Sequence, residues 1–411
     1  MGRAFNWLWA SFAASTVGTW LGFGAFPLIA IQVLDAGPAA VSSLAAAGLA
    51  AGALLALPLG PWAERRRKRP VMIAADVVRC LALLSVPVCH VIGLLSYAQL
   101  VVVSVIGAAG NIAFIAAGGS YLKQVVGPDQ LLRANARFES TAWTAIALGP
   151  VLGGAAVTLL GPVVSVHANA AGFLLSGLAL LAIRVREADP RPAATEPFRL
   201  AALADGWRFI NADRPLRALF RNTIAVNALI MATEPLLAVL LLGELGWPPW
   251  QYGLAFGLPC IGGFIGAQLA ARLEERHGRA RVLTVAGVLR VLSPVGLAFA
   301  APGTSGLILV VVVELAVITC MSVFNPLLAT ERLQRVPDEQ IGRVLTAWTI
   351  TTTASIAGVT ALWGVLATFT GTRVAIGAAG VLLLLVPLLL PGHDRVGPRR
   401  NPEMPGGVCQ L

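Results

Sequence analysis

Charged side chains that interrupt long apolar segments are the first residues of this sequence that could do chemistry. They are Asp76, Arg79, Glu234, Arg290 and Glu314. A charged residue at the centre of a membrane helix costs roughly 2.5–3.5 kcal/mol, so each is a candidate functional residue if its segment crosses a bilayer. Asp76 and Arg79 stand three apart and therefore share one face of a helix.

Glu234 directly precedes Pro235, about halfway along its apolar segment. We favour a carboxyl group that faces a cavity, where it takes up and releases a proton or binds the cationic group of a basic ligand. The alternative is a carboxyl group that bonds locally and stabilises the helix where the proline breaks it. The sequence leaves both interpretations open.

Arg290 and Glu314 lie on consecutive apolar segments. At 1.5 Å per residue, Arg290 is about 12 Å into its segment and Glu314 about 14 Å from the outer end of the next. Since consecutive membrane segments run antiparallel, the two side chains could meet as an ion pair. The alternative is that Glu314 carries a proton. Together with Glu234, both residues are candidates for coupling to an ion.

The composition indicates a membrane protein. Of the 411 residues, 57% are hydrophobic and 12% charged, whereas a soluble domain has about 25% charged residues. This excludes an ordinary soluble enzyme, because so few charges cannot cover its surface. Twelve segments are long enough to cross a bilayer core of ~30 Å. They are residues 6–34, 39–60, 70–92, 98–121, 138–160, 163–184, 217–242, 251–273, 282–300, 305–328, 345–368 and 372–391.

The basic residues between these segments predict the orientation. With the N-terminus inside, the inner connections hold nearly all of the 30 Lys and Arg residues, and the outer connections hold only Arg373. Positive residues collect on the cytoplasmic side of membrane proteins. We therefore expect both termini in the cytoplasm of a bacterial inner membrane, and the net charge of +10 reflects orientation rather than nucleic-acid binding.

We divide the chain into two halves of six helices each, residues 1–185 and 217–391. Between them, residues 186–216 form a cytoplasmic linker, and residues 392–411 form a Pro- and Gly-rich tail that we expect to be disordered. The linker contains an amphipathic pattern that predicts a helix on the membrane surface. Its apolar stripe consists of Leu200, Leu203, Trp207 and Ile210.

An internal repeat relates the two halves. When the second half is shifted back by 211 positions, Arg79 aligns with Arg290 and Lys68 with Arg279. Two six-helix halves related by duplication are typical of secondary transporters, whose binding site lies between the halves near the middle of the bilayer.

Other chemistries have no support in the sequence. The five cysteines show neither a C-x-x-C pair nor zinc-ligand spacing. There is no phosphate-binding G-x-x-x-x-G-K-[ST], no H-E-x-x-H and no G-x-S-x-G. We therefore expect no enzyme activity, no metal and no cofactor. We expect the energy to come from an ion gradient or from the substrate's own gradient, and we favour a proton gradient.

Three stretches carry a family resemblance. G-P-W-A-E-R-R-R-K-R (Gly60 to Arg69) resembles the signature loop of the major facilitator superfamily. The D-V-V-R that follows, the Q-V-V-G-P-D-Q motif from Gln124 and the L-G-P-V-L-G-G motif from Leu148 resemble its branch of siderophore and drug exporters. The resemblance implies an all-α fold of twelve transmembrane helices in two halves. It also implies a monomer that exports an amphiphilic antibiotic, natural product or siderophore by proton antiport.

The resemblance also suggests roles for individual residues. A cytoplasmic latch that holds the halves together would comprise Gly60, Glu64, Arg65, Arg69, Asp76 and Arg79, although the arginines also serve topology. A motif in the fifth span resembles the antiporter signature and would pack against another span and limit leak; its residues are Gly149, Pro150, Gly153 and Gly154. The branch usually has an Asp where this chain has Thr19, so one carboxylate often used for proton coupling is missing.

Other polar and aromatic residues are candidates for the wall of a substrate cavity: Trp20, Asn111, Trp143, Asn227 and Asn325. The indoles could stack on an aromatic substrate, and the amides could line its path or join helices. Two rival functions remain at this stage. One is import or symport by the same fold, and the other is a membrane sensor that transports nothing.

Overall fold

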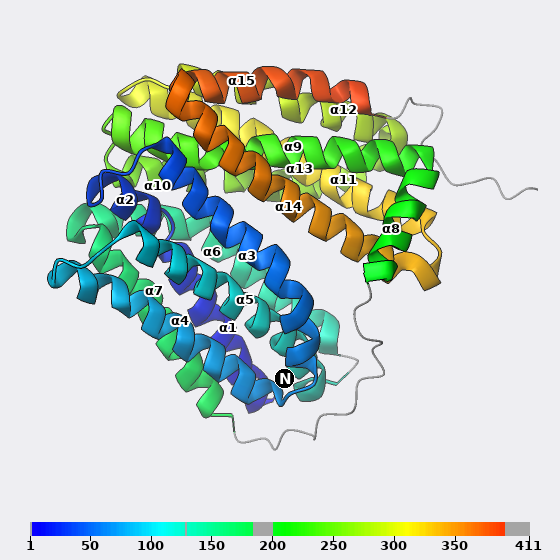
Figure 1. Cartoon of the computed structure of the whole chain (residues 1–411). Coiled ribbons are helices and arrows are strands. Elements are labelled where there is room, and N and C mark those ends of the chain that lie inside the picture. Colours follow the sequence, from blue (N-terminus) through cyan, green and yellow to red (C-terminus); the bar gives the residue numbers. More distant parts are fainter. Residues whose placement is uncertain (1, 128–129, 184–199, 391–411) are drawn as a thin grey trace, which may run out of the picture.

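The computed structural model describes residues 2–127, 130–183 and 200–390, which form helices and no strand (Figure 1). The first half contains α1 (Arg3–Leu21), α2 (Ala25–Gln32), α3 (Pro38–Glu64), α4 (Lys68–Val91), α5 (Tyr97–Val125), α6 (Leu131–Leu160) and α7 (Pro162–Leu181). After α8 (Leu200–Ala212), the second half contains α9 (Arg214–Ala238), η2 (Val239–Glu244), α10 (Pro249–Gly257), α11 (Cys260–His277), α12 (Arg279–Leu292), η3 (Pro294–Phe299), α13 (Thr304–Arg335), α14 (Asp338–Thr370), α15 (Thr372–Leu385) and η4 (Val386–Leu389). The predicted tail and the first part of the predicted linker lie outside the described residues.

These helices confirm the predicted all-helical membrane fold. Within the described ranges, eleven segments are long and apolar enough to cross a membrane. A shorter apolar helix, Ser165–Leu181, lies where the sequence predicts the sixth span. The helices thus agree with a fold of twelve spans.

Several spans are interrupted where glycine or proline requires it. The first span divides into α1 and α2 at Gly24, whose φ of 78° is accessible to a residue without a Cβ. The ninth span changes from α12 to a 3-10 helix at Pro294, since proline cannot donate a helical hydrogen bond. After Pro235, α9 continues as the π-helix η2. Such π segments are frequent at functional sites, and this one follows Glu234.

The helices form two bundles, α1–α7 and α9–α15 (Figure 1). Each bundle has its own buried apolar core, around Phe5 in the first half and Phe324 in the second. A third cluster crosses between them, because it combines Leu28 and Val157 of the first half with Leu236 of the second. The bundles are therefore joined by apolar packing at the level of these residues.

Glycines bring α6 of the first half against α10 of the second. A Cβ on Gly253 would lie 2.1 Å from the carbonyl oxygen of Pro150, and one on Gly154 would lie 2.5 Å from that of Pro249. The approach is thus backbone to backbone, closer than any other residue permits. The amide of Trp250 also donates a hydrogen bond of 3.1 Å to the Thr158 hydroxyl across this contact.

A second close contact joins α3 to α14. A Cβ on Gly364 would lie 2.3 Å from the Cβ of Ser42. Both contacts lie where α3 and α10 begin and where α6 and α14 end, and we call this the closed end. The bundles diverge toward the other end, which carries the N-terminus and α8 (Figure 1). We call that the arginine-rich end, because Arg65–Arg69 and Arg279–Arg281 lie there.

The amphipathic pattern of the linker forms a helix, as predicted. This helix, α8, packs on α9 and α14 of the second half. Ile210 is fully buried, and Trp207 donates a hydrogen bond of 2.8 Å to Thr351. The place of α8 at the membrane surface stays a prediction.

The glycine contacts predict a conformational effect of Gly253→Ala. The added methyl group would overlap the Pro150 carbonyl, and overpacking of this kind costs about 1–3 kcal/mol. Because each 1.4 kcal/mol is a factor of ten in an equilibrium, the closed end should open in a large share of molecules. Spin labels at Leu159→Cys and Phe369→Cys, in a background without native cysteines, should show a longer distance across this end.

Gly358→Ala is the matched control, because a Cβ at this helical glycine would meet no atom within 4 Å. It should leave the distance distribution unchanged. An unchanged distribution in Gly253→Ala as well would show that the glycine contact does not hold the closed end.

Candidate functional site

Asp76 and Arg79 form a buried ion pair in the core of the first half. They stand one turn apart on α4 and are 0% and 3% exposed. Ser176 of α7 donates a hydrogen bond of 2.6 Å to the second oxygen of Asp76, and its hydroxyl also bonds Ser11 of α1 at 2.8 Å. The paired charges thus join α4, α1 and α7. Their predicted part in a latch between the halves stays a prediction.

Arg79 and Arg290 occupy corresponding places in the two halves. The guanidinium carbon of Arg79 lies 5.0 Å from the Phe114 ring, and that of Arg290 lies 3.6 Å from the Phe324 ring. Both arginines of the repeat thus contact a phenylalanine, although the shift of 211 positions aligns Phe114 with Asn325 and not with Phe324. The partners differ, because the repeat places Gly287 in the second half where the first has Asp76.

Arg290 bonds to an amide in place of a carboxylate. It is fully buried and donates a hydrogen bond of 2.5 Å to the Asn222 side chain, whose own amide group donates to the Val386 carbonyl at 3.1 Å. Asn222 of α9 therefore joins Arg290 of α12 to Val386 of η4. Within the described residues, Arg290 has no carboxylate partner.

The ion pair considered between Arg290 and Glu314 is wrong. Arg290 contacts Phe324, which follows Glu314 by about 15 Å along α13 at 1.5 Å per residue. The sequence-based depths were counted from the segment ends. The structure differs because α12 stops at Leu292 and α13 extends to Arg335, well past the predicted end of the tenth span.

Glu314 instead lies near Glu234. The two carboxyl groups are close enough to interact electrostatically, and each of them also interacts electrostatically with Tyr252. They come from α13, α9 and α10, which are three separate spans. No hydrogen bond to the Glu234 carboxyl occurs in the part of the chain that the structure describes, so the local bonding considered for the helix break at Pro235 is not observed.

Aromatic rings connect this acidic cluster to the first half. The centre of the Tyr252 ring lies 4.8 Å from the centre of the Phe256 ring and 5.9 Å from that of the Phe23 ring. Phe23 in turn stacks on Trp20, with 5.9 Å between the ring centres. These ring contacts run from Tyr252 of α10 to Trp20 of α1 and so cross from one half to the other. The role of Trp20 in a substrate cavity stays a prediction.

The antiporter-like motif of the fifth span packs on two partners. Gly149 and Gly153 face the backbone of α1, since added Cβ atoms would lie 2.4 Å from Trp20 and 2.3 Å from the Leu21 oxygen. Gly154 faces α10 of the other half, and Pro150 offers its carbonyl oxygen to Gly253. The motif is therefore built into the closed end. Its implied effect on leak is a prediction that these contacts do not test.

The predicted latch residues lie at the arginine-rich end. Arg65 is exposed. Arg69 donates hydrogen bonds of 2.8 and 2.9 Å to the carbonyl oxygens of Leu180 and Leu181 in its own half. The packing of Gly60 and Glu64 lies outside what the structure describes, and the latch stays a prediction.

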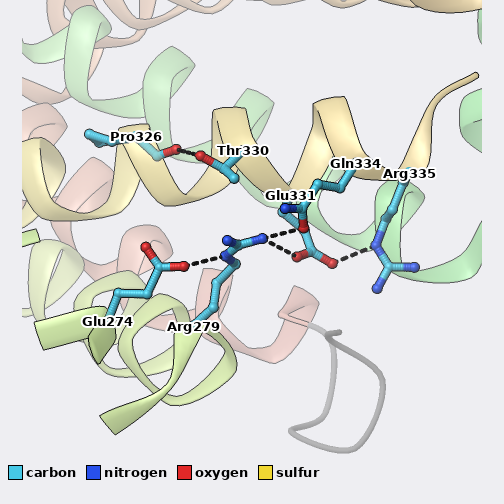
Figure 2. Close-up of polar contacts among 7 residues, drawn as sticks. All are labelled: Glu274, Arg279, Pro326, Thr330, Glu331, Gln334 and Arg335. Carbon is cyan, nitrogen blue, oxygen red and sulfur yellow. Dashed lines mark hydrogen bonds and ion pairs between the residues drawn. The ribbon is translucent and has the colours of Figure 1, made fainter. Parts of the chain in front are cut away.

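A charge network occupies the same end of the second half (Figure 2). Arg279 donates to Glu274 at 2.7 Å and to Gln334, and it lies 3.8 Å from the buried Glu331. Arg335 bonds Glu331 at 2.5 Å. A further ion pair of 3.7 Å between Arg335 and Asp213 connects the network to the start of α9. It fixes α9, α11, α12 and α13 together.

The remaining cavity candidates are spread over several helices. Asn111 of α5 lines a cavity in the first half. Trp143 of α6 is 51% exposed and approaches Gly263 of α11 across the halves. Asn227 is half-buried on α9, and Asn325 is exposed on α13.

The sequence did not indicate three side chains that interact with the buried charges. Tyr252 and Ser176 carry no charge and sit in ordinary apolar surroundings, so only the fold shows their acidic neighbours. Glu331 had a signal, because it stands four residues before Arg335 at the spacing of a helical ion pair. Its place near the end of the tenth span obscured that signal.

Comparison with known proteins gives the family. The model of the Major Facilitator Superfamily matches residues 8–360. The multidrug efflux pump Tap of Mycobacterium tuberculosis (strain ATCC 25618 / H37Rv) is 27% identical over 100% of this chain and 99% of its own. The enterobactin exporter EntS of Escherichia coli O127:H6 is 27% identical over 65% of this chain and 62% of its own.

Solved structures share the fold. A bacterial homologue of the iron transporter ferroportin, in its inward-facing state, matches with a TM-score of 0.70 at 17% identity, covering 93% of this chain and 98% of that one. Its outward-facing state matches with a TM-score of 0.62, covering 94% and 98%. The family model spans most of the chain, and the helices, their halves and their repeat agree with it. The chain therefore belongs to the Major Facilitator Superfamily and is a transporter rather than an enzyme.

Proposed function

We propose that this transporter exports an amphiphilic cation, such as an antibiotic or another natural product, in exchange for protons. It acts as a monomer in a bacterial inner membrane, with both termini in the cytoplasm. The energy comes from the proton gradient, and no cofactor takes part. The observation that carries this proposal is that Glu234 and Glu314, from two different spans of the second half, lie near enough to interact electrostatically with each other and with Tyr252.

The carboxyl pair supports exchange for a physical reason. Two carboxylates held close together in a poorly hydrated site repel each other. Either a proton or a cationic substrate relieves that repulsion, so the two compete for the same place. Competition for one site gives antiport when the empty transporter does not change conformation, because each return of the site across the membrane then requires one of the two ligands.

The conformation supports loading from the cytoplasm. The bundles are joined at the closed end and diverge at the arginine-rich end, and basic residues favour the cytoplasmic side. In this orientation the bundles diverge toward the cytoplasm, the side on which an exporter takes up its substrate. Tap and EntS, whose names describe a multidrug efflux pump and an enterobactin exporter, support the outward direction.

Substitution of either carboxyl group should abolish exchange. In everted vesicles with an acidified lumen, we expect the native protein to accumulate ethidium and a protonophore to abolish this accumulation. Glu234→Gln and Glu314→Gln keep the side-chain size but remove the exchangeable proton, so each should reduce accumulation to near background. Glu244→Gln, at an exposed acid at the end of η2, is the matched control and should keep full accumulation.

Three outcomes of this assay would count against the proposal. Full proton-driven accumulation in both variants would exclude the pair as the proton carrier. Movement of ethidium in the opposite direction would indicate an importer or symporter. Binding of ethidium without movement under any gradient would favour a sensor.

The orientation has its own test. In a background without native cysteines, Arg276→Cys and Leu94→Cys place thiols at exposed positions on opposite ends of the molecule. A membrane-impermeant maleimide added to intact cells should label Leu94→Cys at once and Arg276→Cys only after permeabilisation. The reverse pattern would place the termini outside and overturn the cytoplasmic assignment.

A further inference from the structure

A groove of about 420 Å³ runs between α11 and α12 of the second half, and residues of α13 form its floor. Both helices pack on α13 and much less on each other, and α12 otherwise contacts α15, which belongs to the same half. The groove therefore lies away from the interface between the halves. Its side chains Leu269, Val285 and Leu289 are 36–48% exposed, so in a membrane the groove is open to lipid.

The two sides of the groove are apolar stripes. Side chains four residues apart share one face of a helix, and both sides of the groove consist of such sets. They are Leu269, Leu273 and His277 of α11, and Arg281, Val285 and Leu289 of α12. At 1.5 Å per residue each stripe is about 12 Å long. One leaflet contributes roughly 15 Å of hydrocarbon, so the groove extends through most of one leaflet.

Both stripes end in a basic side chain at the arginine-rich end. His277 is the last residue of α11, Arg281 lies in the first turn of α12, and both are exposed. Neither has an ion-pair partner within the described residues. The nearby Glu274 pairs with Arg279 at 2.7 Å, and Glu275 does not line the groove. The groove thus has an apolar body and a positively charged mouth.

This combination fits an anionic phospholipid. An acyl chain matches the apolar stripes, and the phosphate group then lies at the mouth, where an arginine can form charge-assisted hydrogen bonds with it. Basic pockets between membrane helices bind anionic lipid headgroups in this way. A zwitterionic lipid would add its own cationic group to a mouth that is already positive, so the charge of Arg281 favours a headgroup with net negative charge.

We infer that this groove binds an anionic phospholipid, with its phosphate at Arg281 and His277 and one acyl chain between α11 and α12. We call it the lipid groove. The bound chain fills the space that α11 and α12 leave between them, and it should therefore stabilise the second half. The site depends on neither the cargo nor the direction of transport, and so it goes beyond the proposed function.

Two lipids with identical chains test the charge preference. The purified full chain in detergent micelles is titrated with dioleoyl phosphatidylglycerol, which is anionic, or with dioleoyl phosphatidylcholine, which is zwitterionic, and native mass spectrometry counts the bound lipids. A basic residue near the membrane surface contributes a factor of about five in affinity for anionic lipid. We expect the first phosphatidylglycerol to bind roughly 5- to 20-fold tighter than phosphatidylcholine and to raise the melting temperature.

Variants at the mouth test the position of the headgroup. Arg281→Gln removes the charge and should reduce the preference about 5-fold, whereas Arg281→Lys keeps the charge and should retain most of it. Arg276→Gln is the matched control, because Arg276 is exposed on α11 but does not line the groove. It should keep the native preference.

A second pair of variants tests the position of the chain. Val285→Trp fills the groove and should remove the tight phosphatidylglycerol site. Leu292→Trp adds the same bulk to the same helix outside the groove, at a side chain that is 49% exposed against 48% for Val285, and it should leave the tight site intact. Equal melting temperatures of the lipid-free variants show that both are folded.

Several results would overturn the lipid groove. These are equal affinity for the two lipids in the native protein, an unchanged preference in Arg281→Gln, or tight binding that survives Val285→Trp. Displacement of the lipid by excess inorganic phosphate would show a site for a free anion. A dimer that Val285→Trp abolishes would show that a second copy of the chain occupies the groove. Lipid binding is measured without transport, so none of these results depends on proton exchange.

Discussion

The backbone contact between α6 and α10 is the constraint on which the arrangement of the two halves depends. At Gly154 and Gly253 the helices approach so closely that a single methyl group on either would overlap the facing carbonyl. A membrane offers no hydrophobic force to press helices together, so tight packing of small residues takes over that role. The second contact, at Gly364 and Ser42, adds a fixed point on the other side of the interface. The bundles are thus held together at the closed end, and they diverge toward the arginine-rich end (Figure 1).

The same interface places Tyr252 at the boundary between the two halves. Tyr252 lies on α10, one residue before Gly253. Its ring stacks on Phe23 of the first half, and it interacts electrostatically with Glu234 and Glu314. Any opening of the closed end must therefore move α10, and with it one wall of the acidic cluster. In the proposed exchange, this shared helix would connect protonation of the carboxyl pair to the conformation of the transporter.

Charge is distributed differently on two similar scaffolds. In the first half Arg79 is compensated by Asp76, and the pair joins three helices. In the second half Arg290 bonds to Asn222, and the acids Glu234 and Glu314 stand elsewhere, beside each other. Buried charges are costly unless they are paired, so the unbalanced half is the one expected to respond to protons.

The sequence by itself determined the all-helical membrane fold, the family and the duplication, because apolar length, signature loops and a shift of 211 positions are local or periodic properties of the chain. It also singled out Glu234, Glu314 and Arg290, since a charge inside an apolar run is visible without a fold. Only the tertiary structure decided which of these side chains meet. Arg290 misses Glu314 because helix breaks and extensions change depth in the membrane, whereas Tyr252 joins the acids from a span that carries no charge of its own there. Contacts between spans depend on register and rotation, and neither can be read from one segment at a time.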